Sequence, residues 1–180
     1  VCGLQWTGSS YGVAWKDDMS MHVRTVSADV ASLGSEQVIE GVINDLRTRD
    51  CMAWSGSEFA VYWCDGFMDC WFQRVDLDGN LLGSALDPTT AFDELEYPNV
   101  TWTGSSWMVI FLALNPGGIG LGGSVLASDG TFEVEPTSFY MQSLSFNPPY
   151  LTSWTGSEVV MTWSTHGPRT LTFGRIGWCR

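Results

Sequence analysis

Carboxylate side chains are the residues of this sequence whose type and spacing could support a reaction. Asp93, Glu94 and Glu96 form the densest acidic group, and a pair of carboxylates is what glycoside hydrolysis requires. No motif in the sequence places two carboxylates on opposite sides of a cleft. We therefore expect a protein without catalytic activity, and we keep a hydrolase that uses carboxylates on one rim of the fold as an alternative.

Polar loop residues provide a second group of candidates. Asp65 and Asp69 lie in a loop between two expected strands, where carboxylate oxygens could bind Ca²⁺. Solvated turn residues explain the same pattern, so we expect no cofactor and no metal centre. His166 lies in the equivalent loop near the C-terminus, without the spacing of a catalytic triad. We keep Asp65, Asp69 and His166 as ligand-binding candidates.

Tryptophan is abundant, and the face of an indole ring can stack on a sugar ring. Trp71 and Trp178 do not recur at a fixed spacing, so we expect them to be free to bind a ligand. Large aromatic residues that recur in every structural unit usually fill the contacts between units. We expect this structural role for the recurring tryptophans, which are Trp6, Trp15, Trp54, Trp63, Trp102, Trp154 and Trp163.

A sequence repeat underlies these aromatic positions. The motif Trp-(Ser/Thr)-Gly-Ser occurs four times, and an aromatic residue follows nine positions after each tryptophan. The copies are 48, 48 and 52 residues apart, a period typical of one supersecondary unit repeated in tandem. We expect a single domain over residues 1–180, with repeats at 1–48, 49–96, 97–148 and 149–180.

Each repeat has the pattern of short strands joined by tight turns. The segment 59–63 and its counterparts at 11–15, 107–111 and 159–163 are largely apolar on both faces of an expected strand. A sheet of this kind must be covered on both faces, as in sheets packed around an axis. We therefore predict an all-β fold, a small β-propeller of four blades. The last repeat is short, so the fourth blade should lack its fourth strand. Either this blade keeps three strands and an open edge, or the edge pairs with another chain, or the ring is incomplete.

Composition excludes several classes of partner. The chain has 180 residues, a net charge of −12 and a single lysine, Lys16, so its surface should repel nucleic acids and anionic membranes. The longest apolar run, 107–114, is far shorter than a membrane-spanning helix. We expect no nucleic-acid partner and no insertion into a membrane. No signal peptide is visible, so we expect a chain that is mature, processed or cut from a longer one.

The five cysteines suggest disulfides and therefore an oxidising compartment. Cys2 and Cys179 lie at opposite ends of the chain, which meet in a closed ring, so a disulfide between them would lock the closure. Cys51, Cys64 and Cys70 cluster in the second repeat, where one pair would leave one thiol free or bonded to another molecule. The absence of a CxxC pair argues against a zinc ribbon or a thioredoxin-like site.

The best preserved copy of the repeat, residues 4–15, reads Leu-x-Trp-Thr-Gly-Ser-x-Tyr-Gly-Val-Ala-Trp. This unit resembles a repeat of secreted and surface proteins of bacteria, which are expected to be propellers and usually carry more copies. The number of repeats is similar to that of hemopexin-type propellers, in which a disulfide joins the first and last blades. That arrangement would suit Cys2 and Cys179. The resemblance indicates a fold and implies no particular activity.

These features favour a non-catalytic binding module, extracellular or on the cell surface, that presents propeller loops to a glycan or a protein partner. One alternative is a structural subunit of an extracellular assembly that docks through the open edge of the fourth blade, as a homo-oligomer or in a larger complex. The other alternative is the hydrolase with carboxylates on its rim.

Overall fold

The computed structural model describes residues 1–17, 19–40, 51–64, 70–89, 92, 95–115, 118–141, 146–165 and 171–177, and the statements below concern these ranges. Within them, all regular structure is β-strand, and the strands form four antiparallel sheets. Each sheet lies within one of the expected repeats, so neighbours in the sequence pair locally.

The first sheet contains β1 (Gly3–Trp6), β2 (Ser10–Lys16), β3 (Ser20–Ser27) and β4 (Leu33–Glu40). The second contains β5 (Met52–Trp54), β6 (Glu58–Cys64), β7 (Cys70–Asp76) and β8 (Leu81–Leu86). The third contains β9 (Leu95–Trp102), β10 (Ser106–Asn115), β11 (Gly118–Ala127) and β12 (Phe132–Met141). The fourth contains β13 (Phe146–Trp154), β14 (Glu158–Thr165) and β15 (Leu171–Gly177).

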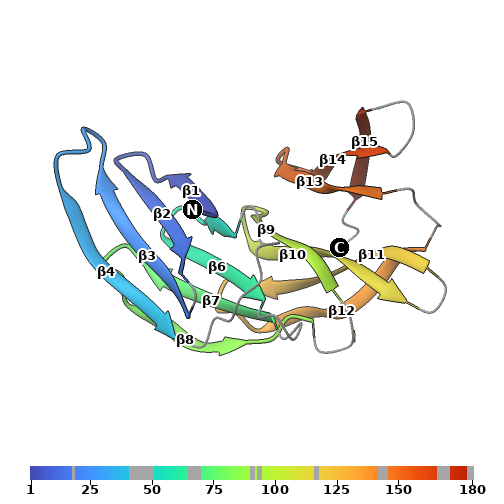
Figure 1. The fold of residues 1–180 in the computed structure, drawn as a ribbon, viewed down its shortest axis with the longest axis horizontal. Coiled ribbons are helices and arrows are strands. Elements are labelled where there is room, and N and C mark those ends of the chain that lie inside the picture. Colours follow the sequence, from blue (N-terminus) through green and yellow to red (C-terminus); the bar gives the residue numbers. More distant parts are fainter. Residues whose placement is uncertain are drawn as a thin grey trace.

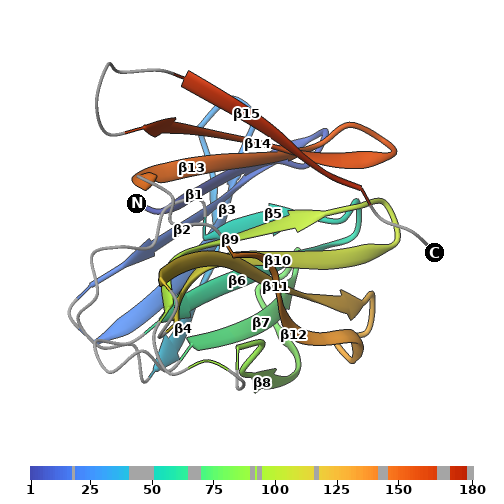
Figure 2. The same ribbon diagram turned by 90° about the vertical axis from the view of Figure 1, so that its right-hand side faces the viewer.

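The four sheets are the blades of a β-propeller, as the repeat predicts. The first strand of each blade lies at the centre, where β1 packs on β5, β5 on β9 and β9 on β13. Figure 1 shows the blades following one another from β1–β4 on the left to β13–β15 at the upper right. The view in Figure 2 places the last blade at the top of the molecule. Within the described residues this blade has three strands, which confirms the expected missing strand.

The recurring Trp-(Ser/Thr)-Gly-Ser motif forms the turn between the first two strands of each blade. In the second blade, the Ser55 hydroxyl accepts a hydrogen bond from the Glu58 amide at 3.0 Å and donates to the Glu58 carbonyl at 3.0 Å. Gly56 has φ of 104°, a left-handed conformation that favours glycine. The tight turn brings Trp54 beside Phe59, with ring centroids 4.6 Å apart. The motif therefore fixes both the hairpin and an aromatic pair.

In the second and third blades, which have a neighbouring blade on each side, the second strand is buried on both faces, as the sequence predicts. Phe59 and Val61 belong to a core shared with the first blade, whereas Tyr62 lies in a core shared with the third. All three side chains are fully buried. The second and third blades therefore direct one face of their second strand to the preceding blade and the opposite face to the following blade.

Small residues allow the blades to approach closely. Gly12 on β2 lies against the ring of Phe59, and a Cβ added at Gly12 would come within 2.3 Å of that ring. In the third blade the Phe111 ring lies over Gly122 of the neighbouring strand, where an added Cβ would be 2.4 Å away. Substituting either glycine would force an aromatic ring out of a densely packed core.

Two disulfides are present among the described residues, and one of them corrects a sequence-based expectation. Cys2 bonds to Cys51, so the expected Cys2–Cys179 bridge is wrong, and Cys179 lies outside the described residues. The reason is local geometry: the Cys51 amide donates to the Cys2 carbonyl at 3.1 Å, where the inner strands of the first two blades meet. Cys64 bonds to Cys70, its direct cross-strand neighbour, which gives the expected pair within the second repeat.

The structural role expected for the recurring tryptophans holds where two blades meet. Trp63 is almost fully buried, and Trp54, Trp102 and Trp154 pack against the cores between consecutive blades. Trp6 differs, because 48% of its surface is exposed. It occupies the same place in the repeat, but within the described ranges no preceding blade covers it. Trp15 is half-buried, and the side chain of Trp163 lies outside the described residues.

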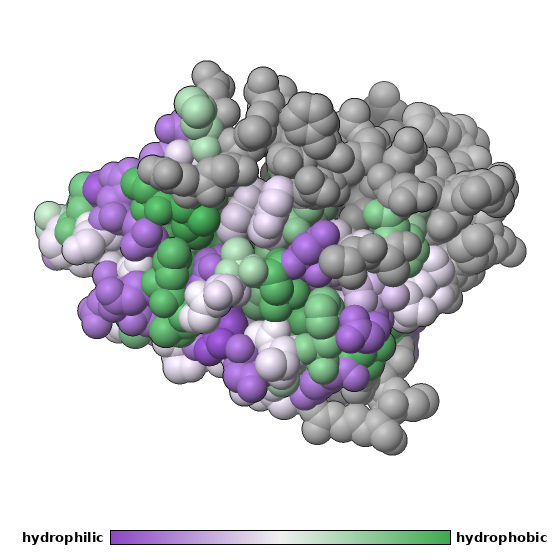
Figure 3. All heavy atoms as spheres, turned by 90° about the horizontal axis from the view of Figure 1, so that it is seen from below, coloured by the Kyte–Doolittle hydropathy of each residue, from purple (hydrophilic) through white to green (hydrophobic). Residues whose placement is uncertain are grey.

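Hydrophobic and hydrophilic residues are mixed on the underside of the propeller in Figure 3. The part of the chain that the structure describes contains no helix long and apolar enough to cross a membrane.

The two disulfides should differ in their contribution to stability, because they close loops of different length. Replacing Cys2 and Cys51 together by alanine opens a loop between residues 49 positions apart and should lower the free energy of unfolding by about 4 kcal/mol. Replacing Cys64 and Cys70 opens a loop between residues 6 positions apart and should cost about 2 kcal/mol. Urea unfolding measures both losses, and peptide mapping of the wild type checks the pairing. Equal losses in the two double variants would contradict this explanation.

Candidate functional site

The inner strands of all four blades surround a central cavity of about 580 Å³. β1, β5, β9 and β13 converge at this cavity. Its wall is therefore lined by residues just before the tryptophan of each Trp-(Ser/Thr)-Gly-Ser motif. The cavity extends onto one face of β14 in the last blade. Its lining consists of Gln5, Met52, Ala53, Trp54, Asn99, Val100, Thr101, Trp102, Leu151, Thr152, Ser153, Trp154, Val160 and Thr162.

Uncharged polar side chains gather on the β9 and β13 side of this cavity. The Thr152 hydroxyl donates a hydrogen bond to the Asn99 side-chain carbonyl, and the Thr101 and Thr152 hydroxyl oxygens are 3.4 Å apart. Asn99 and Thr101 are both buried. On the opposite side, the Gln5 amide donates to the Met52 carbonyl at 2.9 Å and so links the first two blades. The network holds amide and hydroxyl groups in fixed positions at the wall.

Aromatic rings complete the wall. Trp54, Trp102 and Trp154 end three of the inner strands, and each is half-buried, with part of the indole in a core between blades. All three also line the cavity. A concave site with aromatic surfaces and a few placed polar groups is typical of binding sites for small organic ligands. Sugars suit this composition, because they present both apolar ring faces and hydroxyl groups.

No carboxylate is found among the lining residues within the described ranges. Glu96 is the acidic residue nearest in sequence to the lining of β9, and its backbone pairs with Leu112 in the third blade. Its side chain lies outside the described part of the structure, as do Asp93 and Glu94. The described groups can therefore bind a neutral polar ligand, while acid–base chemistry would have to come from carboxylates beside them.

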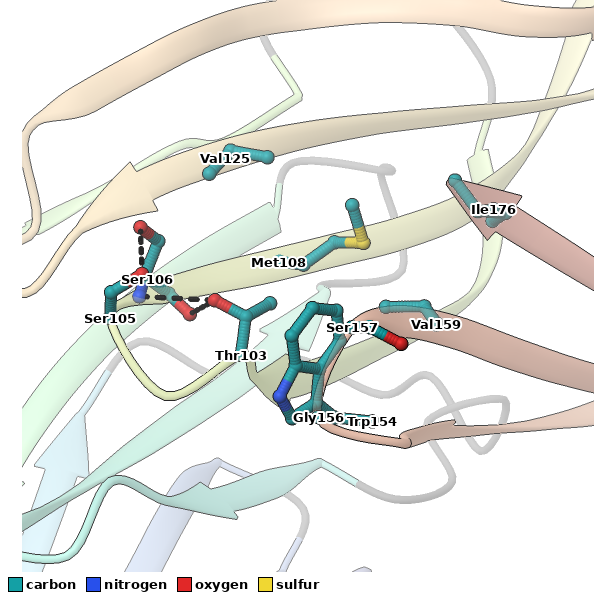
Figure 4. A pocket seen from close by; sticks show the side chains of 10 residues that line it. All are labelled: Thr103, Ser105, Ser106, Met108, Val125, Trp154, Gly156, Ser157, Val159 and Ile176. Carbon is teal, nitrogen blue, oxygen red and sulfur yellow. Dashed lines mark hydrogen bonds between the residues drawn. The ribbon is translucent and has the colours of Figure 1, made fainter. Parts of the chain in front are cut away.

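A second, smaller cavity of about 350 Å³ lies between the third and fourth blades, and its lining is shown in Figure 4. Its apolar wall includes Met108 and Trp154. The hydroxyls of Thr103 and Ser106 also border it, but they are engaged within the turn and the blade. The Thr103 hydroxyl donates to the Ser106 carbonyl at 2.9 Å, and the Ser106 hydroxyl donates to Glu133 at 2.9 Å. The central cavity is therefore the better candidate for a functional site.

Of the sequence-predicted ligand residues, Trp71 alone lies within the described ranges, and the structure places it away from this cavity. Trp71 lies on β7, half-buried and stacked on Trp63 with ring centroids 6.3 Å apart, and it is not part of the cavity lining. The other candidates, Asp65, Asp69, His166 and Trp178, lie outside the described residues, so their role stays a prediction. In the described ranges, no three His, Cys, Asp or Glu side chains form a group that could hold a metal ion.

The cavity residues left a signal in the sequence that the repeat analysis did not use. The residues just before the tryptophan of each Trp-(Ser/Thr)-Gly-Ser motif belong to the inner strand. They are apolar in the second repeat but include Asn99 and Thr101 in the third and Thr152 in the fourth. A position that is apolar in one repeat and polar in another indicates that the two repeats have different roles at that position. Comparing repeats position by position would therefore have pointed to this wall.

A cluster of titratable groups lies on the first blade, away from the central cavity. Both ring nitrogens of His22 face carboxylate acceptors, with Nδ1 2.8 Å from Glu36 and Nε2 3.0 Å from Asp17. Arg24 completes the cluster with a 2.7 Å ion pair to Glu36. Burial of the ring lowers the pKa of His22, but the hydrogen bonds to the two carboxylates outweigh it and leave the pKa above its usual value of 6.5. Trp15 stacks on the imidazole at 5.1 Å.

Comparison with known proteins identifies the fold but no family. No family model matches the sequence, and no curated protein matches it. The structure is similar to a GH43 endo-arabinanase from Bacillus licheniformis, with a TM-score of 0.52 and 9% identity, over 98% of this chain and 72% of that one. It is also similar to an exo-1,5-α-L-arabinanase from a bovine ruminal metagenomic library, with a TM-score of 0.52 and 8% identity, over 97% of this chain and 74% of that one.

These comparisons correct the functional expectation drawn from the sequence. Both similar structures are glycoside hydrolases with five-bladed propellers. They contradict the expected non-catalytic binding module and support the hydrolase alternative better. The expectation of a protein without activity rested on the lack of a recognisable catalytic motif. The lack of a local motif does not decide function, because function depends on the site that the fold assembles. At this level of identity the likeness establishes the fold.

The ionic cluster on the first blade should make the stability of the protein depend on pH. Because the pKa of His22 is raised in the folded state, the stabilisation is complete below pH 6.5 and is lost as pH rises through the folded value. Urea unfolding at about pH 5.5 and about pH 8.5 should show lower stability at the higher pH. The variant His22→Gln should lose much of this difference. An unchanged pH dependence in the variant would show that other groups cause it.

Proposed function

We propose that this protein is a glycoside hydrolase that binds a polysaccharide chain in its central cavity and cleaves it there. The observation that carries the proposal is the coincidence of a fold shared with two arabinanases and a cavity walled by indoles, amides and hydroxyls. By analogy with those neighbours, the substrate class is a 1,5-α-L-arabinan chain. Because a shared fold does not by itself imply a shared substrate, hydrolysis of arabinan has to be measured directly.

Binding in this proposal depends on the uncharged wall. The indoles of Trp54, Trp102 and Trp154 offer apolar surface to sugar rings, and the cavity is large enough for a small oligosaccharide segment. Asn99, Thr101 and Thr152 are already held by one another, so they can meet sugar hydroxyls without a large loss of side-chain freedom. A neutral wall suits a neutral polysaccharide and adds little attraction for charged ligands.

Cleavage requires two carboxylates, one to protonate the leaving oxygen and one to activate water or attack the sugar. We propose Glu96 as one of them, because it lies on β9, the same inner strand that carries Asn99 and Thr101. Asp93 and Glu94 are further acidic candidates in the preceding segment, which lies outside the described residues. A general acid at such a site contributes typically about 10²- to 10⁴-fold to the rate.

We further propose that the protein acts outside the cell or at its surface. Two disulfides fit an oxidising compartment. Polysaccharides too large to cross a membrane are hydrolysed outside the cell, so a secreted hydrolase would meet this substrate. The net charge of −12 keeps such a protein soluble and away from nucleic acids.

Incubation with linear 1,5-arabinan, followed by measurement of reducing ends, tests the proposed function. The wild type should release arabinose or short oligosaccharides. Glu96→Gln should lower kcat/KM by about 10²-fold or more, because the amide can neither donate a catalytic proton nor act as a base. The matched control is Glu135→Gln, which changes an exposed glutamate on β12 of the same blade and should keep full activity.

Two results would contradict the proposal. One is a folded wild type that releases no reducing ends from arabinan or from a panel of other neutral polysaccharides. The other is equal activity in Glu96→Gln and Glu135→Gln, which would contradict the catalytic role proposed for Glu96. Circular dichroism of each variant separates loss of activity from loss of folding.

A further inference from the structure

The internal repeat allows the same position to be compared in every blade. The first core residue of the second strand is Tyr11, Phe59, Trp107 or Val159 in the four blades. Phe59, Trp107 and Val159 are fully buried, because each faces the preceding blade. Tyr11 is only half-buried, although its side chain points to the same side of its own blade. The first blade therefore has one face that no neighbouring blade covers.

Other residues on this face of the first blade show the same difference. Leu4 and Trp6 are 62% and 48% exposed. Val13 is half-buried, whereas its counterparts Val61 and Val109 are fully buried. Single exposed apolar residues are ordinary on a protein surface, but these lie side by side on paired strands, with Leu4 opposite Val13 and Trp6 beside Tyr11.

The last blade has the complementary free face. Thr162 pairs with Phe173 just as Tyr62 pairs with Phe72 in the second blade. Phe72 faces the third blade and is 1% exposed, whereas Phe173 is 65% exposed. Leu151, the other neighbour of Thr162, is 55% exposed. The surface that would face a following blade is therefore apolar and uncovered.

An arginine that recurs in the third strand of the blades indicates what the free face of the last blade would contact. In the second blade, Arg74 forms an ion pair with Glu58 and also donates to the carbonyl of Asp129, in the turn of the next blade. Arg175 is its counterpart in the last blade, where it pairs with Glu158 at 3.4 Å, and 76% of its side chain is exposed. The described structure offers Arg175 no turn of a following blade. A blade with the same Asp-Gly turn would supply that acceptor.

We propose that the free faces of the first and last blades bind a fifth blade built from the same repeat. Such a blade would cover Trp6 and Tyr11 with one face and Phe173 with the other, and would place a turn carbonyl near Arg175. The five-bladed propellers of the two arabinanases, of which this chain spans 72% and 74%, support one added blade. The occupant is thus a sheet of about one repeat.

The fifth blade would also close the central cavity. Val160 and Thr162 belong to the free face of the last blade, and both line the cavity. A sheet packed on that face would add a wall at this side. Packing of a fifth blade does not depend on the proposed hydrolase activity. The proposed blade and the proposed activity can therefore fail independently of each other.

Extending the full chain by a fifth repeat tests the proposal. One extended chain carries a copy of residues 49–96 after residue 180, and a second carries a copy of residues 97–148, so that a single poorly folding copy does not decide the result. Hydroxyl-radical footprinting with mass spectrometry measures the exposure of Trp6 and Phe173. Both should be oxidised several-fold more slowly in an extended chain than in the 180-residue chain, and Tm should rise by roughly 5 °C or more.

A matched pair of substitutions locates the contact. Val13→Lys places a charge on the free face and should leave Tm of the 180-residue chain nearly unchanged, but it should abolish the gain in the extended chain. Val61→Lys changes the equivalent residue at a covered interface and should lower Tm strongly in both. Unchanged oxidation of Trp6 and Phe173 in both extended chains would overturn the proposal. So would a 180-residue chain that is dimeric in light scattering with both residues already protected, because a second copy would then be the occupant.

Discussion

Packing of one blade on the next is the interaction on which the rest of this structure depends. Each sheet is narrow and apolar on both faces, so an isolated blade would expose as much hydrophobic surface as it buries. Stacking supplies the missing cover: Phe59 and Val61 are buried by the first blade and Tyr62 by the third. The close approach requires small residues such as Gly12, which leaves room for the Phe59 ring. Stability is therefore shared between neighbours, as in other repeat proteins.

The central cavity is a consequence of the same packing. Aromatic residues fill the space between blades, whereas the inner strands meet only at their edges and leave room at the axis. Residues there are released from the demand for apolar cover, which is why Asn99, Thr101 and Thr152 are accommodated and hydrogen-bonded to one another. Trp54, Trp102 and Trp154 join the two regions, because each packs against a core between blades and also lines the cavity. Architecture and candidate site are thus built from one repeated unit.

Much of the fold could be predicted because the information is local and repeated. The four motif copies at Trp6, Trp54, Trp102 and Trp154 indicated the number of blades, and the short last repeat indicated the missing strand. The disulfide of Cys2 could not be assigned in this way, since its partner depends on which inner strands lie side by side. The site was also missed. Its hydrogen-bonded polar groups come from two repeats and meet only when β9 and β13 pack together, while the non-recurring Trp71 stacks on Trp63.

The sequence by itself determined the unit of this protein: a small β-sheet with a glycine turn, an aromatic pair and two apolar faces. These properties follow from residues close together in the chain, where alternation and turn chemistry act directly. Only the tertiary structure decided which copies of a repeated residue are buried. Trp6 and Trp54 occupy the same place in the repeat but differ in burial, because burial depends on whether another blade is packed against that face. A repeat specifies its own shape, but its position in the assembly determines its surroundings.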